Sequence, residues 1–256
     1  MIGYEVSGVV EATGREVKHF HNGDEVFYSS SSMLDQGTYA EYHVTKESTL
    51  VRKPFGLSHI DAVGLPVNGS LLWEALIVQS RLSAGETLLI RDGIDCLGMI
   101  AIQVAKVAGA NVVVLCDKYQ MDIAKGMGAD IILERKAKNI HQQIVKATRD
   151  TGVDVFLDTI GGADVSNYLP HLKQSGRMVG LIDMQVNMAA AAAQGIFPKH
   201  VQHQSHHSKL EALYKLIEHE QIRAVVDTVM PLSEVGTAHQ RLERGIMCGK
   251  IILVPN

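Results

Sequence analysis

The sequence predicts an α/β protein, with a doubly wound parallel sheet in the middle of the chain and a smaller strand-rich unit in front of it. From residue 86 to residue 183, short apolar segments alternate with amphipathic ones. This pattern is typical of parallel strands that helices cover on both faces. Before it, short Val-rich or alternating segments are separated by turn signals, which is typical of a small barrel or sandwich.

Composition supports a soluble globular protein of one large or two moderate cores. The 256 residues are 46% hydrophobic and 20% charged, with a net charge of -4, so neither nucleic acid nor an anionic membrane is expected as a partner. No apolar stretch is long enough to span a bilayer, and the N-terminus does not resemble a secretory signal. The three cysteines are far apart, which predicts reduced thiols and a cytoplasmic location.

Strands of the first unit are expected at residues 3–12, 24–28 and 38–44, followed by a helix over 61–80. In the middle of the chain, we expect strands at 86–91, 112–116, 131–133, 153–157 and 178–182, and helices at 97–108, 121–127 and 140–148. The end of the chain predicts helices at 209–219 and 232–244 and strands at 225–230 and 250–254, whereas 188–208 gives little signal. Right-handed crossovers then place a ligand crevice at the carboxyl ends of the parallel strands.

The loop after the first of these strands is the candidate phosphate loop, because it joins a strand to a helix inside a βαβ unit. Two of its residues are glycines, and the candidate binding residues are Gly93, Ile94, Asp95, Cys96, Leu97 and Gly98. One interpretation is nucleotide binding by an altered loop. The other is a plain strand–turn–helix joint in which Asp95 caps the helix and uses the N–H groups that a pyrophosphate would need.

Asp95 would also repel a bound phosphate. A carboxylate about 4 Å from a phosphate costs on the order of 4 kcal/mol at an effective dielectric of about 20, before salt screening. That cost corresponds to as much as about three decades in affinity. Cofactor affinity is therefore the property that this loop puts most at risk.

Taken together, many short motifs resemble those of the medium-chain dehydrogenase/reductases, in the same order and nearly from end to end. They are 3–10 (GYEVSGVV), 23–26 (GDEV), 37–42 (GTYAEY), 65–66 (LP), 84–86 (AGE), 101–106 (AIQVAK), 128–130 (GAD), 152–155 (GVDV) and 249–253 (GKIIL). The most similar branch is that of the zinc-free, quinone-reductase-like enzymes. The resemblance implies a GroES-like catalytic domain, a Rossmann dinucleotide-binding domain and NAD(P)H-dependent hydride transfer to a quinone, enone or carbonyl, often in a homodimer.

The resemblance also implies domain limits. Residues 1–67 correspond to a GroES-like domain that lacks the family's first few dozen residues, 68–208 to the Rossmann domain, and 209–256 to a C-terminal helix and a return to the catalytic domain. The barrel is therefore expected to be incomplete, and the chain is also interpretable as a fragment of a longer protein with an exposed barrel edge.

Zinc is not expected in this chain. Zinc-dependent relatives have a metal-binding His after the first glycine of the first motif, where this sequence has Tyr4. Zinc needs about four N, S or O ligands, and residues 24–37 contain no cysteine-rich lobe. Histidines do gather late in the chain, at His200, His203, His206 and His207. Their irregular spacing favours a solvated loop or an edge strand over a metal site.

The cofactor-binding residues that the resemblance implies lie at three further places. Asp117 follows the second parallel strand, where an acidic residue would favour NAD, but Lys118 beside it could face the 2′-phosphate of NADP. We expect NADP(H) in preference to NAD(H), with a solvated turn as the alternative for this segment. Asp158, Thr159 and Gly161 follow the fourth strand and should lie in the crevice, unless they form a simple strand-end turn.

Other positions depart from the family pattern. The family often has a Thr on the nicotinamide side, and Leu71 stands there, so Ser70 beside it is the candidate contact. Ile182 replaces the glycine that is usual after the sixth strand, and Asp95 and Cys96 stand where the phosphate loop has glycines. These departures favour a competing hypothesis, a non-catalytic family member that has lost dinucleotide binding and serves in binding or assembly.

The enzyme hypothesis needs a group that polarises the acceptor oxygen of a small-molecule substrate. Tyr4, near the position of the lost zinc, is the candidate catalytic donor. The alternative for Tyr4 is a tyrosine buried in the core. No motif marks the substrate pocket, so the substrate is not predicted.

Overall fold

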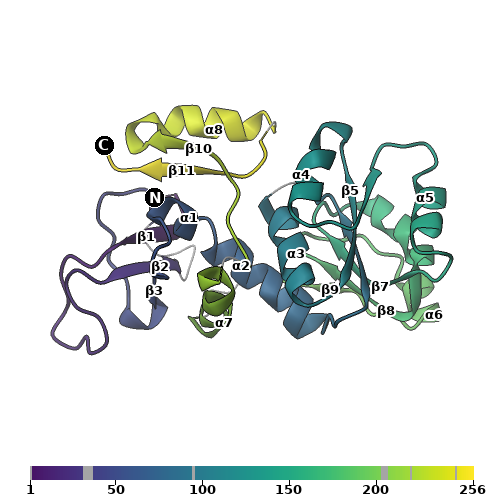
Figure 1. The fold of residues 1–256 in the computed structure, drawn as a ribbon, viewed down its shortest axis with the longest axis horizontal. Helices are drawn as coiled ribbons and strands as arrows, with labels where there is room; N and C mark the ends of the chain where they lie inside the picture. Colours follow the sequence, from purple (N-terminus) through teal and green to yellow (C-terminus); the bar gives the residue numbers. More distant parts are fainter. Residues whose placement is uncertain (1, 31–36, 94–95, 203–206, 220, 246) are drawn as a thin grey trace. The chain divides into compact units, whose positions relative to one another are not determined.

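The computed structural model describes residues 2–30, 37–93, 96–202, 207–219, 221–245 and 247–256. It divides into two compact units (Figure 1). The first unit comprises Met1–Ser70 and His203–Asn256, and the second comprises Leu71–Gln202. The domain limits predicted from sequence, 1–67, 68–208 and 209–256, stay a prediction about how the chain divides.

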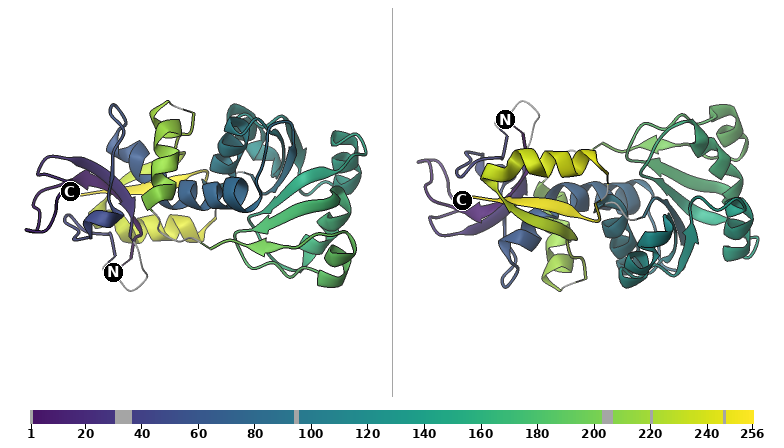
Figure 2. Two further views of the ribbon diagram at one scale, coloured as in Figure 1. Left: turned by 90° about the horizontal axis from the view of Figure 1, so that it is seen from below. Right: turned by 90° about the horizontal axis from the view of Figure 1, so that it is seen from above.

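A six-stranded parallel sheet forms the centre of the second unit, with the order β6-β5-β4-β7-β8-β9. Its strands are β4 (Thr87–Arg91), β5 (Asn111–Cys116), β6 (Ile131–Glu134), β7 (Val153–Asp158), β8 (Leu172–Gly180) and β9 (Lys199–His200). Helices α3 (Cys96–Val107), α4 (Met121–Gly126), α5 (Ile140–Ala147) and α6 (Met188–Ala193) lie on its two faces (Figures 1 and 2). The fold class predicted from sequence is confirmed.

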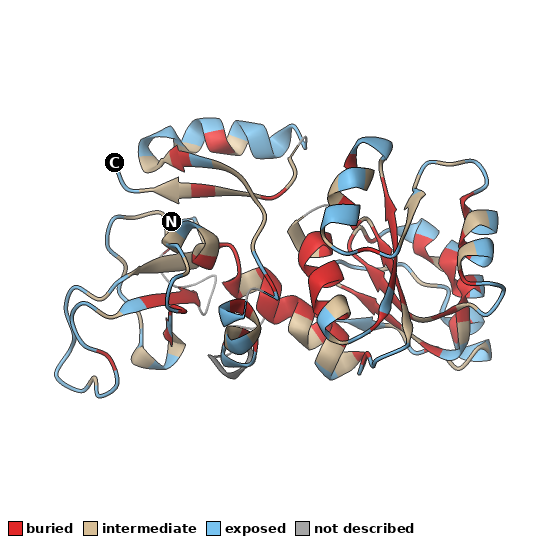
Figure 3. Cartoon of the chain, in the orientation of Figure 1, coloured by how far each residue is buried: buried red, intermediate tan, exposed pale blue. Residues whose placement is uncertain are grey.

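Burial explains why the strands of this sheet are continuously apolar. Helices cover both faces of the sheet, so strand residues on either side lose contact with water, and β4, β5 and β7 lie in the buried interior (Figure 3). A 3-10 segment, η4 (Ala163–His171), adds Tyr168, whose ring stacks on that of Phe156 with centroids 5.2 Å apart. The core of the second unit therefore reaches the loops that follow β7.

The first unit contains a three-stranded antiparallel sheet and a separate parallel pair of strands. The sheet is β1 (Glu5–Val9), β2 (Glu25–Ser29) and β3 (Val51–Arg52), and the pair is β10 (Val226–Pro231) and β11 (Lys250–Val254). Its helical segments are η1 (Glu47–Thr49), α1 (His59–Val63), α2 (Pro66–Leu72) as far as Ser70, α7 (His207–Glu218), η5 (Leu232–Glu234) and α8 (Val235–Glu243). No described helix is long and apolar enough to cross a membrane.

The strand predicted over residues 38–44 is wrong. Only its first residues join the segment before β1, where Thr38 N bonds Gly3 O and Tyr39 N bonds Ile2 O, and no strand is assigned there. Alternating side chains make a strand only when a neighbouring edge pairs with it. Here Tyr42 and Val44 are exposed.

Three further expectations need correction. The single helix predicted over 61–80 is three segments, α1, α2 and the π-helical η2 (Trp73–Gln79), because Pro66 lacks an N–H and is favoured where a helix begins. The strand predicted at 178–182 is the end of β8, which begins at Leu172. Residues 188–208, which gave little signal, contain α6 and β9.

Candidate functional site

The direction of strand order in the second unit reverses between β4 and β7. From β4 the chain proceeds outward through β5 and β6, and then from β7 through β8 and β9 on the other side. In open α/β sheets, ligands bind outside the carboxyl ends of the strands at such a switch point. The loops that follow β4 and β7 therefore form the candidate site.

Close packing explains both glycines of the loop after β4. A Cβ on Gly93 would lie 2.3 Å from a Val114 methyl carbon, and a Cβ on Gly98 would lie 2.4 Å from the Gly93 Cα. Only glycine allows the first turn of α3 to approach the loop so closely, which is the role of the helix-packing glycine in dinucleotide loops. The predicted residues Ile94 and Asp95 lie outside the described residues, so the capping and repulsion arguments for Asp95 stay predictions.

α3 begins at Cys96, one of the three cysteines of the chain. The side chains of Cys96 and Leu97 are partly buried at the start of that helix. The structure thus places the predicted loop residues Gly93, Cys96, Leu97 and Gly98 together at the strand–helix joint.

A buried ion pair joins the loops after β4 and β7. Arg91, the last residue of β4, is 5% exposed, and its Nη1 lies 3.2 Å from Oδ1 of Asp158, which is 0% exposed. Arg91 Nη2 donates to the Asp164 carboxylate at 2.6 and 2.7 Å, and Nη1 donates to Gly161 O at 3.1 Å. The guanidinium also lies over the Tyr168 ring, 5.3 Å from its centroid. Arg91 thus contacts two carboxylates, a carbonyl and an aromatic ring.

The predicted crevice residues after β7 hold this junction together with their side chains. Burial raises the pKa of Asp158, against the opposing effect of the Arg91 charge and of bonds from Ile160 N and Gly161 N. The Thr159 hydroxyl lies 2.8 Å from Arg91 O and 3.1 Å from Asp92 O. The side chains of Asp158 and Thr159 therefore bond to other protein groups within the junction.

Gly161 and the residue after it shape the turn that follows. Both Gly161 (φ 78°) and Gly162 (φ 90°) have positive φ, a conformation that favours glycine. A Cβ on Gly161 would lie 2.6 Å from Asp183 O. The main-chain groups of both glycines bond within the protein, since Gly161 N donates to Asp158 and Gly162 N donates to Asp183 O.

A second ionic cluster lies at the ends of β5 and β6. Asp117 Oδ1 is 3.2 Å from Arg135 Nη2 and Asp117 Oδ2 is 3.0 Å from Lys136 Nζ, while Arg135 Nη1 is 3.3 Å from Asp92 Oδ2. Arg135 thus bridges the carboxylates that follow β4 and β5. Desolvation opposes ionisation of Asp117, but the bond from Lys136 and the charge of Arg135 outweigh it and lower the pKa of Asp117.

The predicted residues Asp117 and Lys118 begin a short 3-10 turn, η3 (Lys118–Gln120), in which Asp117 and Gln120 form a capping box. Lys118 is exposed, and Lys136, also at this edge, is 72% exposed. The edge therefore presents two accessible ammonium groups beside a neutralised aspartate. Arg135 and Lys136 were not predicted as site residues, although the run of basic residues after the third strand was a signal for them.

Two family profiles match the chain. Residues 1–55 match the alcohol dehydrogenase GroES-like domain, and residues 127–253 match a family described as zinc-binding dehydrogenase. The chain is 27% identical to "NAD(P)H oxidoreductase RTN4IP1, mitochondrial" of Mus musculus, over 98% of this chain and 69% of that protein. It is 30% identical to "NADPH-dependent alkenal/one oxidoreductase, chloroplastic" of Arabidopsis thaliana, over 99% of this chain and 63% of that protein.

Among solved structures, the quinone oxidoreductase from Coxiella burnetii matches with a TM-score of 0.85 and 28% identity, covering 98% of this chain and 78% of that one. The chain belongs to the medium-chain dehydrogenase/reductase family. The comparisons confirm the family, the GroES-like first domain and the class of activity, oxidoreductase, that the sequence predicted.

In this medium-chain dehydrogenase/reductase, two predicted residues lie away from the strand ends described above. Tyr4 precedes β1 in the first unit and is 50% exposed, so the alternative of a core tyrosine is wrong. Its carbonyl accepts a bond from Ser30 N. Ser70 is buried within α2, and its contact with a cofactor stays a prediction.

Metal ligation was not expected, although the description of one matched family mentions zinc. Among the described residues, no group of three or more His, Cys, Asp or Glu side chains could hold a metal ion. Of the late histidines, His200 lies exposed in the edge strand β9. His203 and His206 lie outside the described residues.

Proposed function

We propose that this medium-chain dehydrogenase/reductase is an NAD(P)H-dependent oxidoreductase whose dinucleotide binds at the carboxyl ends of β4, β5 and β7. The observation that carries the proposal is the joint between β4 and α3, where Gly93 and Gly98 leave room that any Cβ would fill. Such a joint lets a pyrophosphate approach backbone N–H groups at the start of a helix. The bound nicotinamide would supply hydride for a quinone, enone or carbonyl acceptor.

The names of the relatives support this chemistry. They include "NAD(P)H oxidoreductase", "NADPH-dependent alkenal/one oxidoreductase" and "Quinone oxidoreductase". The chain's own residues would bind and orient the cofactor. The buried pair of Arg91 and Asp158 fixes the spacing of two loops, and the turn at Gly161 packs tightly beside them. Tyr4, which is exposed, remains the proposed donor to the acceptor oxygen.

NADP(H) is the proposed cofactor form, because the ribose end of the site is basic. A ribose 2′-phosphate would meet Lys118, Arg135 and Lys136, whereas Asp117, the residue that would favour NAD, is already paired with two of these cations. A carboxylate engaged in this way is a poor acceptor for ribose hydroxyls. The cationic side chains are free to exchange that carboxylate for a phosphate.

Titration with NADPH and NADH tests the proposal. Trp73 is the single tryptophan and lies in the second unit, so energy transfer from Trp73 to reduced nicotinamide reports binding directly. We expect saturation by NADPH below millimolar concentration and weaker binding of NADH. No change in fluorescence or melting temperature with millimolar NADPH would overturn the function and favour the non-catalytic alternative.

Three accompanying properties are also proposals. We propose function without zinc, which elemental analysis of the active protein tests. We propose a homodimer, which sedimentation or light scattering tests. We propose a cytoplasmic location from the wide separation of the three cysteines in the sequence, although relatives are named as mitochondrial or chloroplastic, and cell fractionation tests this location.

A further inference from the structure

Strand register in the first unit brings a serine and a glutamate to one face of the antiparallel sheet. Ser7 and Val9 of β1 point to the same face, since side chains alternate along a strand. Val9 is paired with Glu25 of β2, so Ser7 and Glu25 are diagonal neighbours on that face. Helix α1 packs against both strands, and its first residue is His59.

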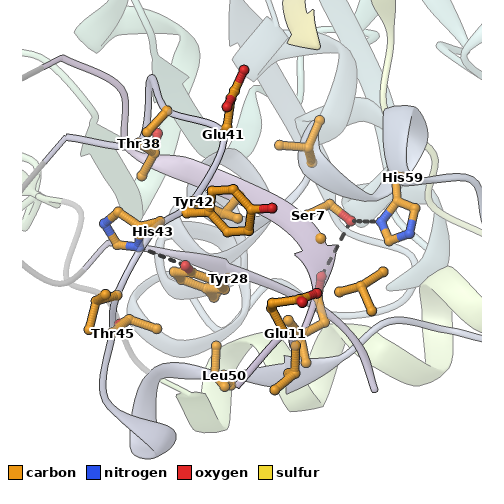
Figure 4. Close-up of a pocket in the computed structure, with 18 of the residues that line it drawn as sticks. Ser7, Glu11, Tyr28, Thr38, Glu41, Tyr42, His43, Thr45, Leu50 and His59 are labelled. Carbon is orange, nitrogen blue, oxygen red and sulfur yellow. Dashed lines mark hydrogen bonds between the residues drawn. The ribbon is translucent and has the colours of Figure 1, made fainter. Parts of the chain in front are cut away.

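These three side chains form a continuous hydrogen-bonded series. Ser7 Oγ lies 2.8 Å from His59 Nδ1 (Figure 4), and His59 Nε2 lies 3.2 Å from Glu25 Oε1. The alternative acceptor for the Ser7 hydroxyl, Val26 O, is farther away at 3.4 Å. A nucleophile bonded to a base, with the base oriented by a carboxylate, is the arrangement by which catalytic triads are recognised.

Glu25 determines which nitrogen of His59 carries the proton. Its second oxygen, Oε2, is 3.1 Å from the buried Lys53 Nζ, and hydrogen bonding from Lys53 lowers the pKa of Glu25. An ionised Glu25 accepts a bond from Nε2–H, which leaves the Nδ1 lone pair for the Ser7 hydroxyl. With this tautomer, Nδ1 is the atom that can remove a proton from Ser7.

Ser7 and His59 both line a pocket of about 700 Å³ in the first unit (Figure 4). Part of the remaining wall is aliphatic, with Val9, Val17, Ile60, Val63, Ile252 and Val254 contributing, and four carboxylates, Glu5, Glu11, Glu41 and Glu47, also line the pocket. A volume of this size holds a small organic molecule, and the carboxylates disfavour anionic ligands. The nucleophile is thus open to a small ligand that carries no negative charge.

We propose that Ser7, His59 and Glu25 form a second active site, which hydrolyses small uncharged carboxylic esters. In the first step Ser7 Oγ bonds to the ester carbonyl carbon while its proton passes to His59 Nδ1. The ester C–O bond then breaks, and the alcohol leaves with that proton. Water, activated by His59, cleaves the acyl-serine to release the acid and restore the hydroxyl. Glu25 is a positioning residue, and no redox partner is needed.

An alkyl fluorophosphonate tests this site in the full chain without nicotinamide cofactor, so the result is independent of the proposed reductase activity. Peptide mapping by mass spectrometry should find a phosphonyl adduct on Ser7. Hydrolysis of p-nitrophenyl butyrate should be lost in Ser7→Ala and fall about 10²–10⁴-fold in His59→Gln, the range for removal of a general base. If Ser7 stays unmodified when the probe is in large molar excess over the protein, the proposal is overturned.

Two variants separate catalysis from structure. Glu25→Gln should lower the maximal rate of inactivation, because His59 loses the carboxylate that orients it. The probe concentration that gives the half-maximal rate should change little, because the pocket is unchanged. Ser83→Ala, which removes an exposed hydroxyl in the second unit and outside this pocket, should be labelled like the parent protein. Equal labelling rates in Glu25→Gln and the parent would refute the positioning role. All variants are compared only at equal melting temperature.

Discussion

Arg91 and Asp158 form an ion pair in which the side chains are 5% and 0% exposed, and this pair ties the carboxyl end of β4 to that of β7. Both residues stand at the switch point of the sheet, where a nucleotide would bind. A charged pair inside a protein is costly to desolvate, and removal of one partner leaves the other without compensation. The pair therefore makes the geometry of the site depend on a single guanidinium.

Replacement of Arg91 is expected to destabilise the second unit strongly. In Arg91→Met, the buried Asp158 loses its cation, and the free energy of unfolding should fall by about 3–5 kcal/mol. Urea unfolding followed by Trp73 fluorescence measures the loss. Adding Asp158→Asn should restore part of it, because the unpaired charge is gone. As a control, Lys136→Ala removes an exposed ion pair and should cost less than about 1 kcal/mol. Equal losses in the two single variants would contradict this account.

Gly98 is expected to tolerate no side chain. An alanine Cβ would lie 2.4 Å from Gly93 backbone atoms and 2.6 Å from Asp92 O. These are backbone atoms, so moving them away costs more free energy than moving the end of a side chain. Gly98→Ala should lose about 1–3 kcal/mol of stability, as overpacking does, and should weaken NADPH binding because α3 shifts. Gly126→Ala in α4 is the matched control, since nothing lies within 4 Å of its Cβ. Unchanged stability and binding in Gly98→Ala would show that the joint is loose.

Regular elements of this fold were predictable because their signals are local. The apolar runs of β4, β5 and β7 and the periodicity of α3 and α5 lie within single segments. The site was less predictable, because its contacts connect distant residues. Arg91 reaches Asp164, 73 positions later, and Arg135 reaches Asp92, 43 positions earlier. A buried arginine at the end of an apolar strand was a signal that partners must exist, but not which ones.

The basic edge predicts a preference for NADPH that mutation should weaken. Lys136→Ala removes one cation from the proposed 2′-phosphate site. An exposed charge pair contributes about 0.2–1 kcal/mol, so the Kd for NADPH should rise by a factor of roughly 1.4 to 5 while that for NADH stays within error. Lys146→Ala makes the same charge change in the last turn of α5, away from the carboxyl ends of the strands, and should affect neither. Parallel losses for both cofactors would place the 2′-phosphate elsewhere.

A histidine pair predicts how stability depends on pH. His141 Nδ1 lies 2.7 Å from the His171 Nε2, and burial, then His141, lowers the pKa of His171 from its usual 6.5. The unfolded chain therefore binds a proton more readily, so stability is complete above pH 6.5 and is lost as pH falls below it, by as much as about 1.4 kcal/mol per pH unit. Unfolding at several pH values should show this slope in the parent and in His200→Ala, but less of it in His171→Leu.

Cysteine chemistry gives a direct test of where the cofactor lies. Burial raises the pKa of Cys116 to about 11, so it should resist iodoacetamide in the folded protein. Cys96 begins α3 at the proposed phosphate site, whereas Cys248 lies in the first unit, and both are partly exposed. NADPH at about ten times its Kd leaves roughly one site in ten open. Alkylation of Cys96 should therefore slow about tenfold while that of Cys248 is unchanged. Binding without protection of Cys96 would move the pyrophosphate away from the loop after β4.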